Sequence, residues 1–240
     1  MATIKKTVNW DRLQHYCVSS IGGFLGAYSL LNCHEVLGNA QTANMILFVH
    51  SILGGDLKSF LVRLVAILIY VAGFFFSIWI PKYTKLNIEV FSLIVDAICI
   101  VSLAVIPLGG NDLVYLYPVF FAMAIQWNTF KSADGYTSST IFSTNNLKQA
   151  TTSLMEYFMD GDAKSLDKSK FFGGTLLGFH LGVAVSYTSY IFLGMMGIWL
   201  AIVPLLISSL VLCKRLSLKQ SQSVEAEVEL EAETEDYKLA

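Results

Sequence analysis

Apolar runs long enough to cross a lipid bilayer recur along the chain from about residue 14 to residue 213. A transmembrane helix needs about 20 largely apolar residues to cross a hydrocarbon core about 30 Å thick. Only 14% of the residues are charged, against about 25% in a typical soluble domain. The chain is therefore predicted to be an all-α polytopic membrane protein. The predicted transmembrane helices are six, at residues 14–32, 58–80, 88–107, 113–130, 171–193 and 194–213.

The second half of the chain repeats short motifs of the first half. A Thr-x-Asn tripeptide at residues 42–44 recurs at 144–146, and Gly-Asp-x-Lys-Ser at residues 55–59 recurs at 161–165. Duplicated motifs that lie between membrane spans are typical of transporters built from two related halves. The predicted halves are membrane repeat 1 at residues 14–107 and membrane repeat 2 at residues 113–213.

Two segments between the predicted spans are too short to cross the membrane. Residues 42–53 are apolar but number only about 12, and their counterpart at about 144–158 is more amphipathic, with Lys148 and Glu156. A length in this range suggests a re-entrant or interfacial helix. If neither segment crosses, each repeat has three spans, and an odd number of spans inverts the second repeat relative to the first.

The basic residues predict the orientation. With the amino terminus inside and six crossings, only Lys58 and Arg63 fall on the outer side, near or inside the second span. The positive-inside rule therefore predicts a multi-pass protein of the cell membrane with both termini cytoplasmic, residues 1–13 forming the cytoplasmic amino terminus. The basic residues predicted to be cytoplasmic are Lys5, Lys6, Arg12, Lys82, Lys85, Lys131, Lys148, Lys164, Lys168, Lys170, Lys214, Arg215, Lys219 and Lys238.

The carboxyl-terminal segment, residues 219–240, is acidic and carries hardly any bulky apolar residue. Such a segment cannot bury enough surface to offset the entropy of ordering it, so a disordered cytoplasmic tail is predicted. A solvated end-piece and a docking segment for a regulatory partner both fit this composition. The acidic residues are Glu225, Glu227, Glu229, Glu231, Glu233, Glu235 and Asp236.

Three motifs resemble those of a known family. They are Gly22-Gly23-Phe24-Leu25-Gly26-Ala27-Tyr28, Thr42-Ala43-Asn44, and Ala122-Met123-Ala124-Ile125-Gln126-Trp127-Asn128. In order and spacing they resemble the YoaK-like family, domain of unknown function 1275, over nearly the whole chain apart from the acidic tail. The resemblance implies a six-span inner-membrane protein and brings no established substrate. Gly26, Ala43 and Ala124 stand where the family usually has Asp, Gly and Gly, so the resemblance implies no ion coupling at position 26.

Asp96 is the clearest candidate for a functional residue at membrane depth. It lies within the apolar run 91–100, where Ser92 is its only polar neighbour. A charge near the bilayer centre costs about 2.5 kcal/mol or more, and such residues mark ion or substrate pathways. A cation or proton site between the repeats is one interpretation. A structural ion pair with Arg63, or an acid kept protonated by desolvation, is the other.

The duplicated Thr-x-Asn motifs are the best candidates for a substrate-binding centre. If the two short helices are re-entrant, their first turns present free backbone N–H groups at membrane depth, and Thr or Asn can hold a polar solute there. The same residue types are favoured as ordinary helix caps, which is the alternative. Gln126 and Asn128 either complete the site or make interhelical hydrogen bonds. The predicted substrate-binding residues are Thr42, Asn44, Asp96, Gln126, Asn128, Thr144 and Asn146.

Three glycines in the fifth predicted span, Gly174, Gly178 and Gly182, recur every four residues and predict one smooth helix face for close packing. His180 points away from that face. As a lone histidine it is interpreted either as a hydrogen-bonded structural residue or as a proton relay.

The sequence contains none of the common enzyme signatures, so the protein is predicted not to be an enzyme and to need no cofactor. The scattered cysteines indicate neither a metal site nor a redox pair. A net charge of −2 argues against nucleic acid as a partner. The leading hypothesis is a small polar-solute permease or channel-like carrier, with the lipid bilayer and a small polar solute as partners. The alternative is a non-transporting assembly or sensor protein that acts through its cytoplasmic loop at 131–170 and its tail.

Overall fold

The computed structural model describes residues 8–33, 36–106 and 110–239, with side chains described as far as residue 222. It is helical almost throughout, which confirms the predicted all-α fold. Residues 1–7 of the predicted cytoplasmic amino terminus lie outside the described residues. The helices are α1 (Trp10–Asn32), α2 (Thr42–Leu53), α3 (Leu57–Tyr83), α4 (Ile88–Val105), α5 (Asp112–Tyr115), α6 (Tyr117–Thr129), α7 (Thr144–Asp160), α8 (Ala163–Leu193), the 3-10 helix η1 (Gly194–Ala201) and α9 (Ile202–Leu239). Two short strands, β1 (Ser132–Ala133) and β2 (Tyr136–Thr137), form an antiparallel hairpin.

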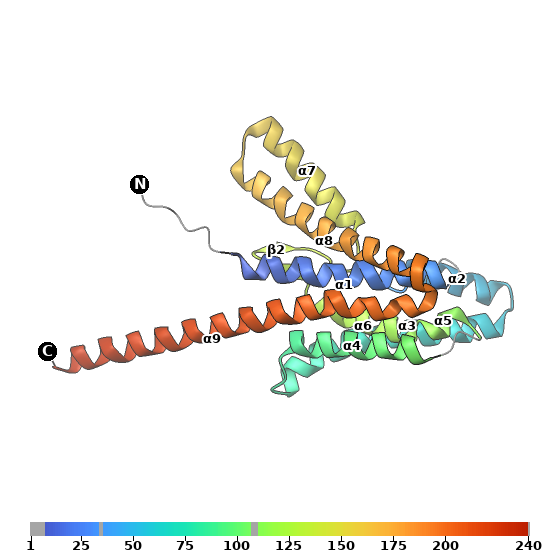
Figure 1. The fold of residues 1–240 in the computed structure, drawn as a ribbon, viewed down its shortest axis with the longest axis horizontal. Helices are drawn as coiled ribbons and strands as arrows, with labels where there is room; N and C mark the ends of the chain where they lie inside the picture. The colour runs from blue at the N-terminus through green and yellow to red at the C-terminus, as the bar shows by residue number, and fades with distance from the viewer. Residues whose placement is uncertain (1–7, 34–35, 107–109, 240) are drawn as a thin grey trace.

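The long helices lie along one axis of the molecule and alternate in direction (Figure 1). Helices α1, α4 and α8 run one way, whereas α3, α6 and α9 run the other way. The beginning of α1 and the end of α9 lie at the same end of the molecule. The turn between α2 and α3 lies at the opposite end from the turn between α7 and α8.

The duplicated Gly-Asp-x-Lys-Ser motif forms the same turn twice. Gly55 and Gly161 each end a short helix in the left-handed region, both with φ of 71°, which glycine adopts without steric cost. The aspartate that follows then caps the next helix. The hydroxyl and backbone N–H of Ser59 donate to Asp56 and lower the pKa of its carboxyl group. Backbone N–H groups of Lys164 and Ser165 and the Ser165 hydroxyl likewise lower the pKa of Asp162.

The two halves pack in the same way when α1, α2, α3 and α4 are matched with α6, α7, α8 and α9. Helix α1 packs on α8 and α9, and α6 packs on α3 and α4. Helix α2 packs on α3 as α7 packs on α8, and α4 packs directly on α9. Each half therefore contributes its first helix to the other half, so the two halves form one interlocked bundle.

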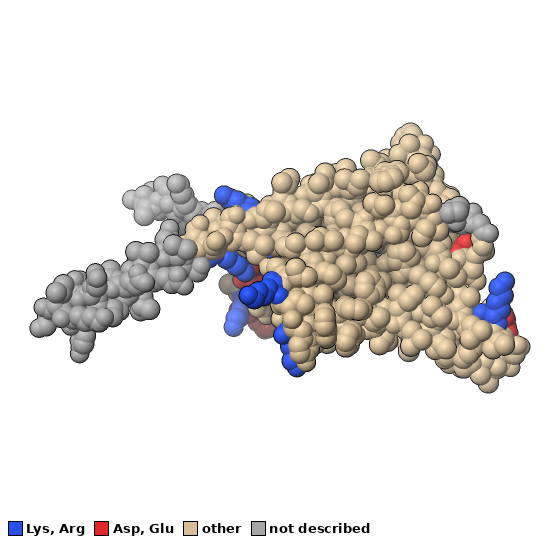
Figure 2. All heavy atoms as spheres, turned by 90° about the horizontal axis from the view of Figure 1, so that it is seen from below, with Lys and Arg blue, Asp and Glu red and all other residues tan. Residues whose placement is uncertain are grey.

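The described residues have the length and apolarity of a membrane-embedded protein. Three helical stretches are long and apolar enough to span a bilayer, at Leu57–Tyr83, Ile88–Val105 and Ala163–Gln222. The last covers 60 residues because α8, η1 and α9 are contiguous, and it folds back at Gly194, where φ is 55°. Charged side chains gather at the two ends of the face shown in Figure 2 and are absent from the broad band between them. The number of six spans stays a prediction.

Some boundaries differ from those predicted. The predicted span at 113–130 is divided into α5 and α6, which begins with Pro118 in its first turn. Proline is tolerated there because the first N–H groups of a helix have no partner within it. The backbone of α9 is helical through Leu239, where the composition predicts a disordered tail. This segment lacks Gly and Pro and is rich in Glu, Ala and Leu, which have high helix propensity.

The predicted glycine face of α8 packs on α1, which confirms the close-packing prediction. A Cβ atom at Gly182 would lie 1.9 Å from the carbonyl oxygen of Ser20, and one at Gly178 would lie 2.4 Å from that of Tyr16. Gly23 on α1 is just as close to the carbonyl oxygen of Phe179. The crossing therefore places the two backbones in contact. His180 lies off this face and its Nδ1 is 2.8 Å from the carbonyl oxygen of Leu176, which supports the structural interpretation.

Reporter fusions will test the predicted orientation. A reporter fused after Lys219 and one inserted at residues 84–86 are expected to read as cytoplasmic, because both lie at the basic end. A reporter at Gly110-Asn111 is expected to read as external, as judged by paired phosphatase and fluorescent-protein activities. A cytoplasmic signal at 110–111 would contradict the six-span topology.

Candidate functional site

A polar cavity of about 360 Å³ opens at the end of the bundle where α1 begins. Four helices and the β1–β2 hairpin contribute to its wall, which places it on the axis of the bundle rather than on its side. The residues that line it include Asp11, Gln14, His15, Glu89, Thr129 and Arg215.

Charged residues at the cavity mouth are paired with one another. Arg215 on α9 is buried and forms ion pairs with Glu89 on α4 and, at 3.2 Å, with Asp11 on α1. Lys219 is 3.1 Å from the same Asp11 carboxylate. These contacts tie the ends of three helices together and leave little net charge at the entrance.

The β1–β2 hairpin covers one side of the cavity and is held by Arg12. Arg12 contacts Asp134 at the hairpin tip and makes a two-pronged contact with Asp167 on α8. The Tyr136 hydroxyl donates to the same Asp167 at 3.1 Å. Because an Arg–carboxylate fork fixes direction as well as distance, the hairpin is positioned relative to both α1 and α8.

Several buried polar atoms in the cavity wall have no hydrogen-bond partner within the described residues. Both amide atoms of Gln14, Nε2 of His15 and Oγ1 of Thr129 are among them. Gln14 is completely buried and His15 is 2% exposed. Each buried polar group without a partner lowers the stability of the fold by about 1–3 kcal/mol. A polar molecule that bonded to these groups would remove this cost.

The irregular segments that precede the two short helices meet inside the bundle. The Asn39 side-chain amide donates to the carbonyl oxygen of Ile141 at 2.7 Å. Gln126 on α6 donates to the hydroxyl of Thr140 at 3.2 Å and to the carbonyl oxygen of Val18 at 3.3 Å. The segments that precede the two Thr-x-Asn motifs are thus in contact with each other. Gln126 links the second of these segments to α1.

The predicted Thr and Asn residues themselves occupy separate networks. Asn44 accepts from Arg63 at 3.1 Å and donates to Gln41 at 3.2 Å. Asn146 accepts from the Ser138 hydroxyl and donates to the carbonyl oxygens of two residues in the segment before α7. Thr42 and Thr144 are exposed. Among the described residues no hydrogen bond joins Asn44 to Asn146, and neither α2 nor α7 has a side-chain cap.

The other two predicted residues, Asn128 and Asp96, differ in their contacts. Asn128 donates to the Ser77 hydroxyl at 2.7 Å, so it makes the interhelical bond between α6 and α3 that was one of its two interpretations. Asp96 is completely buried, and neither of its carboxylate oxygens has a hydrogen-bond partner among the described residues. The ion pair with Arg63, one of the alternatives for Asp96, is not formed between these side chains, and the Arg63 guanidinium donates to Asn44.

The sequence did not identify the cavity residues Gln14, His15 and Thr129. Gln14 and His15 stand at the start of an apolar run, where polar residues are ordinary. Glu89 and Arg215 are 126 residues apart in the chain, so no local sequence spacing predicts their ion pair.

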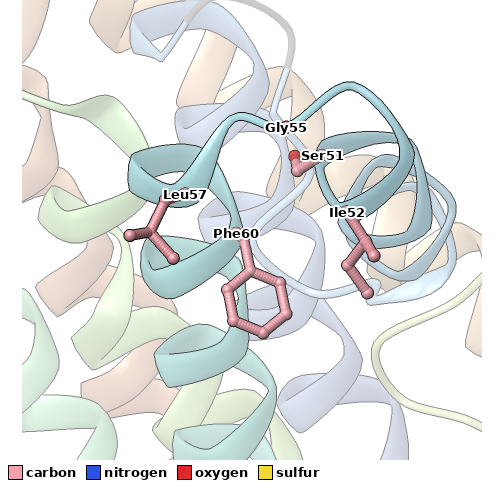
Figure 3. A pocket seen from close by; sticks show the side chains of 5 residues that line it. All are labelled: Ser51, Ile52, Gly55, Leu57 and Phe60. Carbon is pink, nitrogen blue, oxygen red and sulfur yellow. The ribbon is translucent and has the colours of Figure 1, made fainter.

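A second cavity, also of about 360 Å³, lies at the opposite end, beside the α2–α3 turn. Ile52 from α2 and Leu57 and Phe60 from α3 extend away from the turn at Gly55 and surround it (Figure 3). Ser51 is the only polar side chain among the five residues that line it. An apolar pocket on the outside of a membrane helix pair suits acyl chains better than a polar solute. The described residues contain no group of three or more His, Cys, Asp or Glu that could hold a metal ion.

The chain is similar to one family of known proteins. A family model described as "Protein of unknown function (DUF1275)" matches residues 14–211. The chain belongs to this family. The match to DUF1275 begins within α1 and ends within α9, so it includes the whole interlocked bundle and leaves out the acidic carboxyl-terminal segment. Neither a curated protein nor a solved structure matches the chain.

Proposed function

We propose that this DUF1275 protein is a small polar-solute permease or channel-like carrier of the cell membrane, and that the polar cavity is its cytoplasmic entrance. The observation that carries the proposal is the set of unpaired polar atoms on Gln14, His15 and Thr129. Buried donors and acceptors without partners are retained where a ligand or ordered water satisfies them.

The cavity wall indicates the chemistry of the solute. Its carboxylates and basic groups neutralise one another at the mouth, whereas amide, imidazole and hydroxyl groups are free further in. Such a set recognises hydrogen-bonding groups rather than a strong net charge. A neutral or zwitterionic solute that fits within about 360 Å³ is the class it suits.

The relation between the two halves supports a transport cycle. Two inverted repeats require matching packing in the two halves and opposite directions for corresponding helices. Both features are present here (Figure 1). At the other end of the same helices, the hydroxyls of Tyr28 and Tyr115 lie 2.9 Å apart and donate to the carbonyl oxygens of Met195 and Leu103. In the proposed cycle this cluster closes the outer side while the cytoplasmic side is open.

Gln14→Leu tests the proposal in proteoliposomes screened against a panel of neutral and zwitterionic solutes. For a solute that the wild type transports, the variant is expected to reduce uptake about tenfold, because it removes one amide from the binding wall. Its thermal stability should be unchanged or higher, since leucine buries no unpaired polar atom. Gln149→Leu, on the half-buried surface of α7, is the matched control.

The alternative assembly or sensor role predicts a different result. Deleting residues 220–240 would then abolish a cellular phenotype while no solute in the panel is transported by the full chain. Uptake that persists undiminished in Gln14→Leu would contradict the assignment of the cavity as the entrance.

A further inference from the structure

Asp96 belongs to a polar stripe that runs along one face of α4. Glu89, Ser92, Asp96 and Cys99 follow one another at intervals of three or four residues, so they share one side of the helix. Glu89 lies at the cavity and faces Arg215. Asp96 lies two turns further in, completely buried, and has no hydrogen-bond partner in the described part of the chain. An isolated carboxylate in such a place is too costly to remain charged and unpaired.

Contacts at both ends of the bundle align α4 with α1 and α9. At the cavity mouth Arg215 contacts both Glu89 and Asp11. At the far end the Tyr28 hydroxyl donates to the carbonyl oxygen of Met195, and the Tyr115 hydroxyl, 2.9 Å from that of Tyr28, donates to the carbonyl oxygen of Leu103. Helix α9 is therefore antiparallel to α1 and α4, as Figure 1 also shows.

This alignment places residues of different helices at one depth. Seven residues inward from the mouth, about 10 Å along a helix, lie Val18 on α1, Asp96 on α4 and Ser208 on α9. Gln126 on α6 joins the same level, because its amide nitrogen donates to the carbonyl oxygen of Val18. Ser208 and Gln126 are completely buried.

The polar atoms left unpaired at this level are oxygens. They belong to the Asp96 carboxylate, the Ser208 hydroxyl and the Gln126 amide, and the Ser92 hydroxyl lies one turn nearer the cavity. Oxygen atoms of carboxylate, hydroxyl and amide groups are the ligands that hard cations prefer. A single carboxylate balances a single positive charge, whereas calcium sites use several carboxylates.

We propose that Asp96, together with Ser208 and Gln126, forms a binding site for a monovalent hard cation, either a proton or sodium. In this proposal the cation would reach the site from the polar cavity, which Glu89 lines two turns away from Asp96. The bound cation would couple to solute movement, a role that rests on the proposed permease function, whereas the binding itself does not.

No charged side chain of the described residues forms an ion pair with Asp96. On the elements that pack against α4, the buried side chains that titrate or carry charge are Arg215 at the mouth and Tyr70 on α3. Arg215 is already paired with two carboxylates. Cys99 lies one turn further along α4, and beyond it the hydroxyls of Tyr28 and Tyr115 lie 2.9 Å apart. Within the described residues Asp96 has no ion pair, so a cation is the missing partner.

Thermal unfolding of the full-length protein in detergent tests binding without any solute. We compare the wild type with Asp96→Asn between pH 6 and pH 9, in choline chloride and in sodium chloride at equal ionic strength. In choline, raising the pH is expected to lower the Tm of the wild type by roughly 5 °C, because the proton that neutralises Asp96 is lost. Sodium is expected to restore the loss if it is the ligand. Asp96→Asn should show neither effect, since its side chain is neutral at every pH.

Asp160→Asn, which removes an exposed carboxylate at the end of α7, is the control and should behave as the wild type. Ser208→Ala separates the two ligands. If sodium binds, this variant retains the pH dependence but needs a higher sodium concentration. If only the proton binds, Ser208→Ala matches the wild type and sodium has no effect in either.

The proposal is overturned if wild type and Asp96→Asn have the same pH and sodium dependence. Its failure is distinguishable from failure of the permease function. Cation binding with no transport of any solute would exclude only the permease. Solute uptake that is indifferent to pH, sodium and Asp96→Asn would exclude only the coupled cation site.

Discussion

Gly182→Ala is expected to destabilise the protein by about 3 kcal/mol, because the added methyl group overpacks the crossing of α1 and α8. The added Cβ would lie 1.9 Å from the carbonyl oxygen of Ser20, a backbone atom that cannot rotate away. Helices α1 and α8 would have to separate along their whole crossing. Chemical unfolding followed by circular dichroism in detergent measures the change.

Gly173→Ala is the matched control for this prediction. It makes the same chemical change in the same helix, but nothing lies within 4 Å of the added atom. Alanine is the better helix former, so this variant is expected to be neutral or stabilised by about 0.5–1 kcal/mol. Equal stability of the two variants would mean that α1 and α8 do not cross in backbone contact.

Arg215→Met is expected to cost about 2 kcal/mol, because it leaves the carboxylates of Glu89 and Asp11 at the cavity mouth without their common partner. Breaking a buried ion pair from one side costs about 3–5 kcal/mol, and the partial exposure of both acids reduces the figure here. The same unfolding measurement applies.

The double variant Arg215→Met with Glu89→Gln should recover about half of that loss, since one uncompensated charge is then removed. Lys214→Met removes the same charge from the exposed neighbouring position of α9 and should change the stability by less than about 0.5 kcal/mol. A double variant no more stable than Arg215→Met would show that Glu89 and Arg215 do not depend on each other.

Much of the fold could be predicted because its signals are local. The apolar runs predict the long helices, and the Gly-Asp-x-Lys-Ser motifs mark both tight turns. The glycines of α8 predict its close crossing with another helix. The family follows from motifs within single helices and agrees with the match over residues 14–211. In the tail, charge pattern and helix propensity favour different outcomes, and the backbone is helical.

The candidate site could be predicted only in part, because its members meet through packing. Asp96 was identified from its position in an apolar run, since burial of a lone acid is visible in sequence. The sequence left an ion pair with Arg63 open, and the structure decides against it, because Arg63 on α3 donates to Asn44. Asn44 and Asn146 occupy the same position of the Thr-x-Asn motif but belong to separate hydrogen-bond networks. Residues at equivalent positions in two repeats need not be neighbours in space.

The sequence by itself determined the membrane setting, the helical class, the duplicated turns and the family, since each depends on composition or on spacing within one segment. Only the tertiary structure decided that Gln14, Glu89, Thr129 and Arg215 line one cavity, and that Asp96 and Ser208 lie at one depth beneath it. The physical reason is that depth and facing between helices are set by distant contacts, here the Arg215 ion pairs and the Tyr28–Tyr115 cluster. These contacts join residues far apart in the chain, and no periodicity within a single helix encodes them.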